Sequence, residues 1–540
     1  MKAIVNPILR GFHPDPCLCE ARGKYYLATS TFQWLPAVSL YESSDLVEWS
    51  PVGGALPELD LRGIPDSAGV WAPDLTFDGE RFWLVYTVAR QIDGIYKDVS
   101  NFVVTAKSIE GPWTEPVFIN ASGFDPGMFH EDGRHYVLNP QWDPRPLAGH
   151  HRFNGLIMQE FSLERGLMGE PRVVLGNSDA VNWLREGPHI MKREGWYLIA
   201  CAEGGTGRRH RIRMARSRSL WGPYGVCPEP LVCAWCTSSP LRKAGHGNII
   251  QGPDGGWYAC FLCARYLPDG NKPNVAFDES EEGVSPLGRE TALAPVIWEE
   301  GWPCLAEGGF EPKLVYGEPG EKRKLKPGDA GYRYETDFSA YEALWQEEWL
   351  APRRMPVVLP GAHGLTLAGG DSPSSRFDRS SLSRRATSFS YRATTEVESF
   401  EPSHYNQSAG LIVEYDSRSF VYLHQTWDEE RRCRVIDVLV NDNGEFAMPA
   451  NRVSVPADDV TVLLGVDVVE GALRLFYSFD HGEEQWIECP DGVLVLDASA
   501  MSDEHVAGWT YTGTMVGITC VDMFDKSARA TFGSFVYEDR

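Results

Sequence analysis

Short apolar and aromatic runs, separated by turns that contain Gly and Pro, recur along the first half of the chain. The clearest example covers residues 184–204, in which Glu186 precedes an apolar run and Trp196-Tyr197 opens a second one after a Gly. Such runs bounded by Gly and Pro are typical of two strands joined by a tight turn. Glu186 at the start of a strand is therefore either a surface residue or a functional group.

The same signal at the start of the second strand repeats at intervals of 53 to 61 residues. It occurs at Tyr25-Tyr26, Phe82-Trp83, His135-Tyr136, Trp196-Tyr197 and Trp257-Tyr258. A repeat of this length, built from short strands and turns, is typical of the four-stranded blades of a β-propeller. Five signals predict five blades.

An acidic residue or a histidine precedes the second aromatic residue of each signal by 9 to 12 positions: Asp15, Asp74, Asp125, Glu186 and His246. In a propeller the first strand of each blade lines the central channel, so we expect these segments to face one axis. Carboxyl groups that are far apart in sequence then meet at one site. Blade two departs from the pattern, because Trp71 and Ala72 occupy the region where an acid is expected. Trp71 is either a wall of that site or a core tryptophan.

The aromatic repeat stops after about Leu305. Residues 318–330 are charged and rich in Gly and Pro, as expected of a connector. Alternating segments such as GLIVEYD, SFVYLHQTW and CRVIDVLV then favour a β-sandwich. We therefore predict an all-β chain with a five-bladed propeller at 1–317, a linker at 318–330 and a sandwich at 331–540. The Arg- and Ser-rich residues 374–388 are expected to form a solvated loop.

The amino-acid composition and the net charge limit the partners and the location to be expected. The chain has 540 residues, of which 43% are hydrophobic, and a formal net charge of −25. The acidic balance argues against nucleic acids and anionic membranes as main partners. The N-terminal segment shows no secretory signal and no run is long enough to span a membrane, so a cytoplasmic location is expected. The sequence leaves open whether the chain forms a homo-oligomer.

Twelve cysteines do not make a disulfide scaffold in a chain of this length. Cys233 and Cys236, together with Cys260 and Cys263, match the spacing of a structural zinc site. The second pair, however, lies in the expected strand WYACFLC, where side chains at positions i and i+3 point to opposite faces. We therefore favour reduced, buried thiols over zinc.

Eight motifs resemble the glycoside hydrolase family 43 β-xylosidases: NPILRGFHPDP, TSTFQWLP, GVWAPDL, ASGFDPGMFH, REGPHI, AEGGT, GHGNII and PLGRET. The resemblance covers the propeller and continues more weakly to the tail. It implies a five-bladed propeller, a C-terminal concanavalin-like β-sandwich, and removal of terminal xylose or arabinofuranose from oligosaccharides with inversion. By the same matches Asp15 is the expected general base, Glu186 the general acid, and Asp125 the residue that tunes the acid and orients the substrate. The expected substrate-binding residues are Phe32, Trp71, Trp142, Thr206, His246, Arg289 and Tyr511.

This set of acids suits the implied chemistry. Inverting hydrolysis needs one carboxylate to deprotonate water and one carboxylic acid to protonate the leaving oxygen. We expect Asp125 to raise the pKa of Glu186 by like-charge repulsion. We also expect Arg289 to hold Asp125 or a sugar hydroxyl. The segment AGWTYTGTMVG, with Trp509 and Tyr511, resembles a loop that closes the pocket in relatives, although both aromatics are also compatible with a sandwich core.

Several alternatives stay open at this level. The main activity is either that of a β-D-xylosidase or that of an α-L-arabinofuranosidase. A non-catalytic carbohydrate-binding propeller is the main rival from outside the enzymes. Retaining fructosidases need an Asp nucleophile with distant RDP and EC signatures, a set that we do not find, and a phosphorylase would need a cationic phosphate cluster. No cofactor is required, while the resemblance leaves a Ca²⁺ ion near His246 open.

Overall fold

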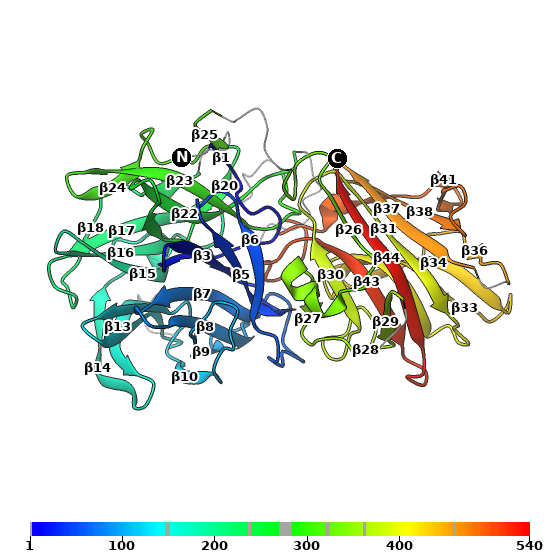
Figure 1. Cartoon of the computed structure of the whole chain (residues 1–540), viewed down its shortest axis with the longest axis horizontal. Coiled ribbons are helices and arrows are strands. Elements are labelled where there is room, and N and C mark those ends of the chain that lie inside the picture. Colours follow the sequence, from blue (N-terminus) through cyan, green and yellow to red (C-terminus); the bar gives the residue numbers. More distant parts are fainter. Residues whose placement is uncertain are drawn as a thin grey trace.

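The structure is a computed structural model that describes residues 3–145, 152–235, 239–268, 283–318, 325–359, 363–457 and 460–540. It contains two β-rich bodies side by side (Figure 1). The first, coloured blue to green, is a five-bladed propeller, and the second, yellow-green to red, is a sandwich of two sheets. The predicted fold class, an all-β propeller followed by a concanavalin-like sandwich, is confirmed.

Each blade is an antiparallel sheet whose innermost strand comes first in the chain. The innermost strands are β2 (Cys17–Ala21), β7 (Gly69–Phe77), β11 (Gly127–Glu131), β15 (Arg185–Arg193) and β20 (Arg242–Gly245). The outer strands of blades one to three are β3 (Lys24–Thr29), β5 (Ala37–Ser43), β6 (Ser50–Leu56), β8 (Phe82–Gln91), β9 (Asp98–Ala106), β10 (Val117–Asn120), β12 (Arg134–Trp142), β13 (Phe153–Ser162) and β14 (Gly166–Leu175). Blades four and five add β16 (Trp196–Glu203), β17 (Arg211–Ser217), β18 (Gly225–Val226), β19 (Val232–Cys233), β21 (Ile249–Gln251), β22 (Trp257–Ala264), β23 (Glu290–Glu299) and β24 (Trp302–Leu305).

The repeated aromatic signal marks the start of the second strand of each blade, as predicted. These strands are apolar along almost their whole length, because both of their faces pack against neighbouring blades; β8, for example, is buried over its first eight residues. The inner strands touch in sequence around the axis, from β2 to β7, β11 and β15. Side chains from different blades therefore meet in the channel.

The N-terminal segment ties the first blade to the last. The strand β1 (Ile4–Val5) pairs with β25 (Val315–Tyr316), which follows blade five. The side-chain amide of Asn6 donates to the backbone oxygens of Leu293 and Lys313. These contacts join residues that lie about 300 positions apart and close the ring.

The sandwich packs a nine-stranded sheet on a seven-stranded one. The larger sheet contains β26 (Arg333–Thr336), β28 (Val358–Leu359), β29 (Leu365–Ala368), β31 (Tyr391–Phe400), β37 (Val462–Val469), β38 (Ala472–Phe479), β39 (Gln485–Trp486), β42 (Val495–Asp497) and β44 (Arg529–Asp539). The smaller one contains β30 (Ser381–Arg385), β32 (Gln407–Asp416), β33 (Ser419–Asp428), β34 (Cys433–Asp442), β35 (Glu445–Ala447), β36 (Val453–Ser454) and β43 (Met515–Asp522). Alternate residues of both sheets, such as Leu411 and Val466, fill the core between them.

The expectation of a solvated loop at residues 374–388 is wrong for its central part. Residues 381–385 form the buried strand β30, and Arg379, Arg384 and Arg385 are at most 7% exposed. Their guanidinium groups have partners that local sequence does not reveal. Arg379 pairs with Glu414, and Arg385 donates to the backbone oxygen of Phe12 in the propeller. Buried charge is tolerated here because each cation is paired or hydrogen-bonded.

Candidate active site

One cavity of about 640 Å³ opens where the inner strands of the propeller begin. All ten residues expected at the site line it: Asp15, Phe32, Trp71, Asp125, Trp142, Glu186, Thr206, His246, Arg289 and Tyr511. Nine of them come from the propeller and Tyr511 comes from the sandwich. Asp74, the displaced acid of blade two, does not line this cavity and lies deeper in the channel.

Asp15 is held by three groups just before β2. Ser30 Oγ donates to Oδ2 at 2.7 Å, Arg289 Nη1 donates to Oδ1 at 3.1 Å, and His246 Nδ1 lies 3.8 Å from Oδ1. Two flanking prolines restrict the backbone, and Asp15 itself has a φ of 53°. Burial alone raises the pKa of Asp15, but Arg289, His246 and the Ser30 hydroxyl outweigh it, so the pKa lies below its usual value. The group is an ionised carboxylate at neutral pH.

Glu186 has the opposite electrostatic environment. It is the second residue of β15, where the ladder with β16 is irregular between Glu186 and His189. Gly187 adopts a φ of 53°, and a Cβ atom there would lie 2.5 Å from His246 Cε1. This irregularity turns Glu186 into the cavity. Burial, followed by the negative charge of Asp15, raises the pKa of Glu186 to about 7.

Asp125 precedes β11 and is 7% exposed. Its backbone N–H donates to Thr87 Oγ1 at 2.9 Å, and its φ is 49°. Burial and the neighbouring Glu186 and Asp15 carboxyl groups raise its pKa well above the usual value. Asp125 is therefore the acid whose ionisation is most strongly opposed. The main causes of the raised Glu186 pKa are burial and Asp15, whereas the sequence led us to expect Asp125.

Aromatic rings form a continuous wall around the carboxyl groups. The ring centroid of Tyr511 lies 5.7 Å from Phe32 and 5.9 Å from Trp71, and Trp71 packs edge-on against Phe124. Trp71 is 7% exposed and belongs to the propeller core, so it is both a core residue and a wall of the cavity. Tyr511 packs on the propeller core instead of the sandwich core.

Arg289 links this wall to Asp15. Its guanidinium carbon lies 5.4 Å from the ring centroids of both Phe32 and Tyr511, and Nη2 donates to the Tyr511 backbone oxygen at 3.1 Å. Arg289 contacts Asp15, although the sequence suggested Asp125 or a sugar hydroxyl. Among the residues described, its buried Nε has no hydrogen-bond partner, so a donor remains for a ligand.

Sequence reasoning missed two functional side chains. Ser30 lies in the TSTFQWLP motif and bonds Asp15, so the motif itself carried a signal. Lys97 comes from the β8–β9 connection, which has no repeat signal. Its ammonium lies 5.2 Å from the Trp142 ring centroid and 4.7 Å from that of Trp509, and its charge lowers the pKa of Glu186. The dipeptide Glu488–Cys489 has the letters of the EC signature of retaining fructosidases. It forms the short strand β40 in the second body and does not line the cavity.

The sequence suggested two metal sites, one for Ca²⁺ near His246 and one for zinc at four cysteines. Near His246, Arg289 already holds the Asp15 carboxylate and His189 holds that of Asp74, so the side chains do not form the oxygen cage that Ca²⁺ prefers. Cys260 and Cys263 are free, buried thiols in β22. Cys236, the fourth member of the supposed zinc set, lies outside the described residues. In the part of the chain that the structure covers, no helix has the length and hydropathy of a membrane-spanning segment.

Both bodies of the molecule have relatives among known proteins. Residues 4–303 match the model of the glycosyl hydrolases family 43, and residues 345–538 match the β-xylosidase C-terminal concanavalin A-like domain. A putative β-xylosidase from Escherichia coli K12 is 38% identical, with 99% of each chain covered. Xylosidase/arabinosidase 43B from Humicola insolens is 37% identical, over 99% of this chain and 98% of its own.

A solved structure resembles the whole molecule. The crystal structure of xylan β-1,4-xylosidase from Bacillus halodurans C-125 superposes with a TM-score of 0.88 at 33% identity, over 99% of this chain and 100% of that chain. The propeller family model alone matches more than half of the chain. With its propeller, its sandwich and its group of buried acids, the chain belongs to glycosyl hydrolase family 43.

Proposed function

We propose that the protein is an inverting exo-glycosidase that releases terminal β-D-xylose from xylo-oligosaccharides and also accepts α-L-arabinofuranosides. The observation that carries this proposal is the pair of carboxyl groups in one cavity whose pKa values move in opposite directions. The Asp15 pKa is lowered, while that of Glu186 is raised to about 7. A base and an acid that coexist near neutral pH are what inverting hydrolysis requires.

In this mechanism Asp15 accepts a proton from the attacking water, and Glu186 donates its proton to the leaving glycosidic oxygen. The water attacks the anomeric carbon as the bond to the leaving oxygen breaks, and the configuration at that carbon is inverted. Arg289 keeps Asp15 ionised, and its guanidinium lines the cavity in which the sugar binds. Asp125 stays protonated beside Glu186 and orients the sugar.

The shape of the cavity supports exo action. Phe32, Trp71 and Tyr511 form a wall on which one sugar ring can pack, and the carboxyl groups lie beside it. A pocket closed by aromatic rings excludes water other than the nucleophile. We therefore propose that the sandwich completes the site. The proposal includes a propeller at residues 1–317, a linker at 318–330 and a sandwich at 331–540. The described cysteines are free thiols, which supports a reducing compartment such as the cytoplasm.

The proposal is tested by the stereochemistry of the product. Proton NMR during hydrolysis of an aryl β-D-xyloside is expected to show α-xylose first, followed by slow mutarotation to the β-anomer. Early β-xylose would contradict the roles of both carboxyl groups. Parallel assays with aryl β-D-xyloside and aryl α-L-arabinofuranoside decide which activity is the main one, since relatives carry both names.

A further inference from the structure

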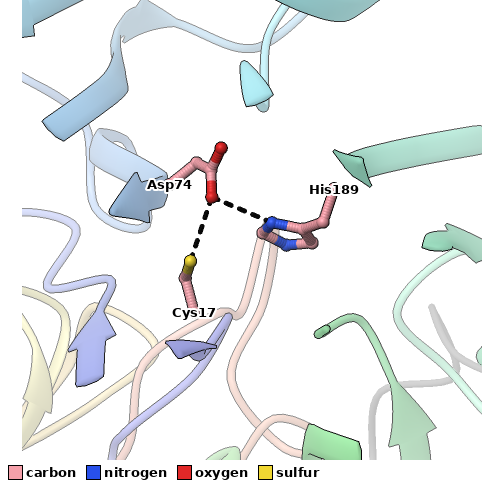
Figure 2. Close-up of side chains that lie close together, drawn as sticks. All are labelled: Cys17, Asp74 and His189. Carbon is pink, nitrogen blue, oxygen red and sulfur yellow. Dashed lines mark hydrogen bonds and ion pairs between the residues drawn. The ribbon is translucent and has the colours of Figure 1, made fainter. Parts of the chain in front are cut away.

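A second group of reactive side chains lies in the propeller channel, below the proposed active site. Cys17 opens β2, Asp74 lies in β7 and His189 lies in β15, so three different blades contribute to it (Figure 2). Their exposed fractions are 1%, 3% and 8%. The mechanism proposed above uses none of the three. Within the described residues, they form the only group of three or more His, Cys, Asp or Glu side chains close enough to hold one ion.

The distances in this group fit a small metal ion. Asp74 Oδ1 lies 3.0 Å from Cys17 Sγ and 3.0 Å from His189 Nδ1, and all three ligand atoms lie within 4.8 Å of one another (Figure 2). The usual Zn–S, Zn–N and Zn–O bond lengths place the ligand atoms of one tetrahedral ion roughly 3 to 4 Å apart. Shifts of a few tenths of an ångström would therefore admit an ion at the centre.

The ligand types select the class of metal. Ca²⁺ and Mg²⁺ prefer oxygen donors, whereas a sulfur, a nitrogen and a single carboxylate oxygen are a typical donor set for Zn²⁺ and neighbouring divalent transition metals. This site therefore differs from the Ca²⁺ position considered near His246.

Neighbouring backbone groups orient two of the three side chains. The Met128 N–H donates to Asp74 Oδ2 at 2.6 Å, which leaves Oδ1 turned towards Cys17 and His189. The Leu75 N–H donates to Cys17 Sγ at 3.3 Å, a contact that stabilises negative charge on sulfur. Hydrogen bonds that fix ligand groups in this way are a regular part of metal sites.

Hydrogen bonding alone does not complete the group. Without an ion, the Cys17 thiol and the His189 N–H both donate to Asp74, but His189 Nε2 has no partner among the described residues although it is buried. Buried polar atoms in native structures are rarely left unsatisfied. An ion bound at Nδ1 would leave the Nε2–H to bond a water in the adjoining cavity, as the outer nitrogen of a metal-bound histidine commonly does.

A separate cavity gives access to the group. It has a volume of about 270 Å³ and is lined by Asp74 and His189 together with Cys19, Phe77 and His130. These last three residues lie further along the inner strands than the residues of the main cavity, so this cavity opens at the opposite end of the channel. It offers an entry path for an ion and room for a water molecule as a fourth ligand.

We propose that Cys17, Asp74 and His189 bind one divalent transition-metal ion of the Zn²⁺ class, with water as a fourth ligand. The ion would join blades one, two and four at the axis. The His189 and His246 rings are 6.0 Å apart, so the ion would lie behind the floor of the active site without reaching the substrate. Its expected role is structural.

The test uses the full chain after treatment with a chelator, and Co²⁺ as an optical probe. Wild-type protein is expected to bind one Co²⁺ per chain, with a thiolate-to-metal absorption band and the d–d bands of a tetrahedral site, and Zn²⁺ should displace it. Added Zn²⁺ should also raise the Tm of the wild type, because an ion that binds only the folded state stabilises it. None of these readouts depends on glycosidase activity.

Cys17→Ala and His189→Gln should each abolish the absorption band and weaken Zn²⁺ binding by at least about 100-fold, since loss of even an outer-shell partner costs 10- to 100-fold. Cys19→Ser is the matched control: Cys19 lies in the same strand as Cys17 and lines the cavity beside Asp74 and His189 but is outside the group, so the band should persist in this variant. Circular dichroism of the metal-free variants separates loss of a ligand from loss of the fold. Absence of stoichiometric binding in the wild type, or a band that survives in folded Cys17→Ala, would overturn the proposal.

Discussion

At the scale of single residues, the local environment decides the protonation state of each carboxyl group. Asp15 and Glu186 are similarly buried, yet Asp15 has a guanidinium at 3.1 Å and a hydroxyl at 2.7 Å. Glu186 is buried beside the negative charge of Asp15, and the positive charges of Arg289 and Lys97 offset these two effects only in part. Burial therefore raises the pKa of Glu186, because nearby cations offset it only in part, whereas ion pairing reverses the effect of burial on Asp15.

The pH profile of activity should follow from these shifts. Glu186 must be protonated, so kcat/KM is expected to fall as the pH rises through about 7. Asp15 must be ionised, so activity should fall only in acid, below its lowered pKa. Lys97→Met removes a cation that lowers the Glu186 pKa and should move the alkaline limb to higher pH by up to about one pH unit. Exposed Lys107→Met is the control, and an unmoved limb in Lys97→Met would contradict the coupling.

The two catalytic roles should separate by leaving group. Glu186→Ala is expected to lose about 10²- to 10⁴-fold in kcat for xylobiose, whose leaving oxygen needs a proton, and far less for an activated aryl xyloside. Asp15→Ala should lose activity on both substrates, because both need an activated water. Steady-state kinetics on the two substrates measure the difference. Equal losses in Glu186→Ala would remove Glu186 from the acid role.

At the scale of elements, the segment that leads into β43 matters most. Tyr511 N–H donates to Ser67 Oγ at 3.0 Å, and Trp509 Nε1 donates to Asp93 Oδ1 at 2.9 Å. Both bonds connect the sandwich to loops of the propeller. The segment therefore places an aromatic ring over the cavity without taking part in the sandwich core.

Removal of either ring tests this role. Tyr511→Ala or Trp509→Ala is expected to lower kcat/KM for xylobiose by about 1 to 3 kcal/mol in at least one case, the range for a lost aromatic contact. The Tm should change little in that variant. Tyr405→Ala, which alters an exposed tyrosine of the sandwich, serves as the control. Wild-type kinetics in both variants would leave the segment a purely structural connection.

At the scale of the whole molecule, buried ion pairs join the two bodies. Lys243 Nζ, in β20 of the propeller, lies 2.9 Å from Asp503 Oδ2 and 2.7 Å from Glu504 Oε1, both in the sandwich. All three residues are at most 6% exposed. Asp503 also accepts from the Tyr415 hydroxyl at 2.7 Å. The network fixes the chain only seven residues before Tyr511, so interface and active site are connected.

Lys243→Met leaves two buried carboxylates without their cation and should cost about 3 to 5 kcal/mol in the free energy of unfolding. KM for xylobiose is expected to rise as well, because the following segment carries Tyr511. Chemical denaturation and steady-state kinetics measure the two effects. Adding Asp503→Asn and Glu504→Gln to Lys243→Met removes the unpaired charges and should restore much of the stability. If Lys243→Met alone unfolds like the wild type, the network does not stabilise the junction of the two bodies.

The sequence by itself determined the repeated strands, the five blades and the acids that begin the inner strands. These features depend on local signals: turns, apolar runs and a regular spacing around Tyr26, Tyr136 and Tyr197. Strand alternation likewise determined the sandwich. Such local structural preferences can be recognised in the sequence because each one spans fewer than a dozen residues.

Only the tertiary structure decided which groups act on one another. Arg289 and Asp15 lie 274 positions apart, and their contact sets the direction of the Asp15 pKa. Arg379 and Arg385 are buried because they bond Glu414 and the Phe12 backbone oxygen, and the sequence of their polar segment does not predict these partners. Cys17, Asp74 and His189 carry no shared motif and meet only because three blades converge on one axis. Such contacts depend on the closure of the ring and the docking of the sandwich, which no local pattern encodes.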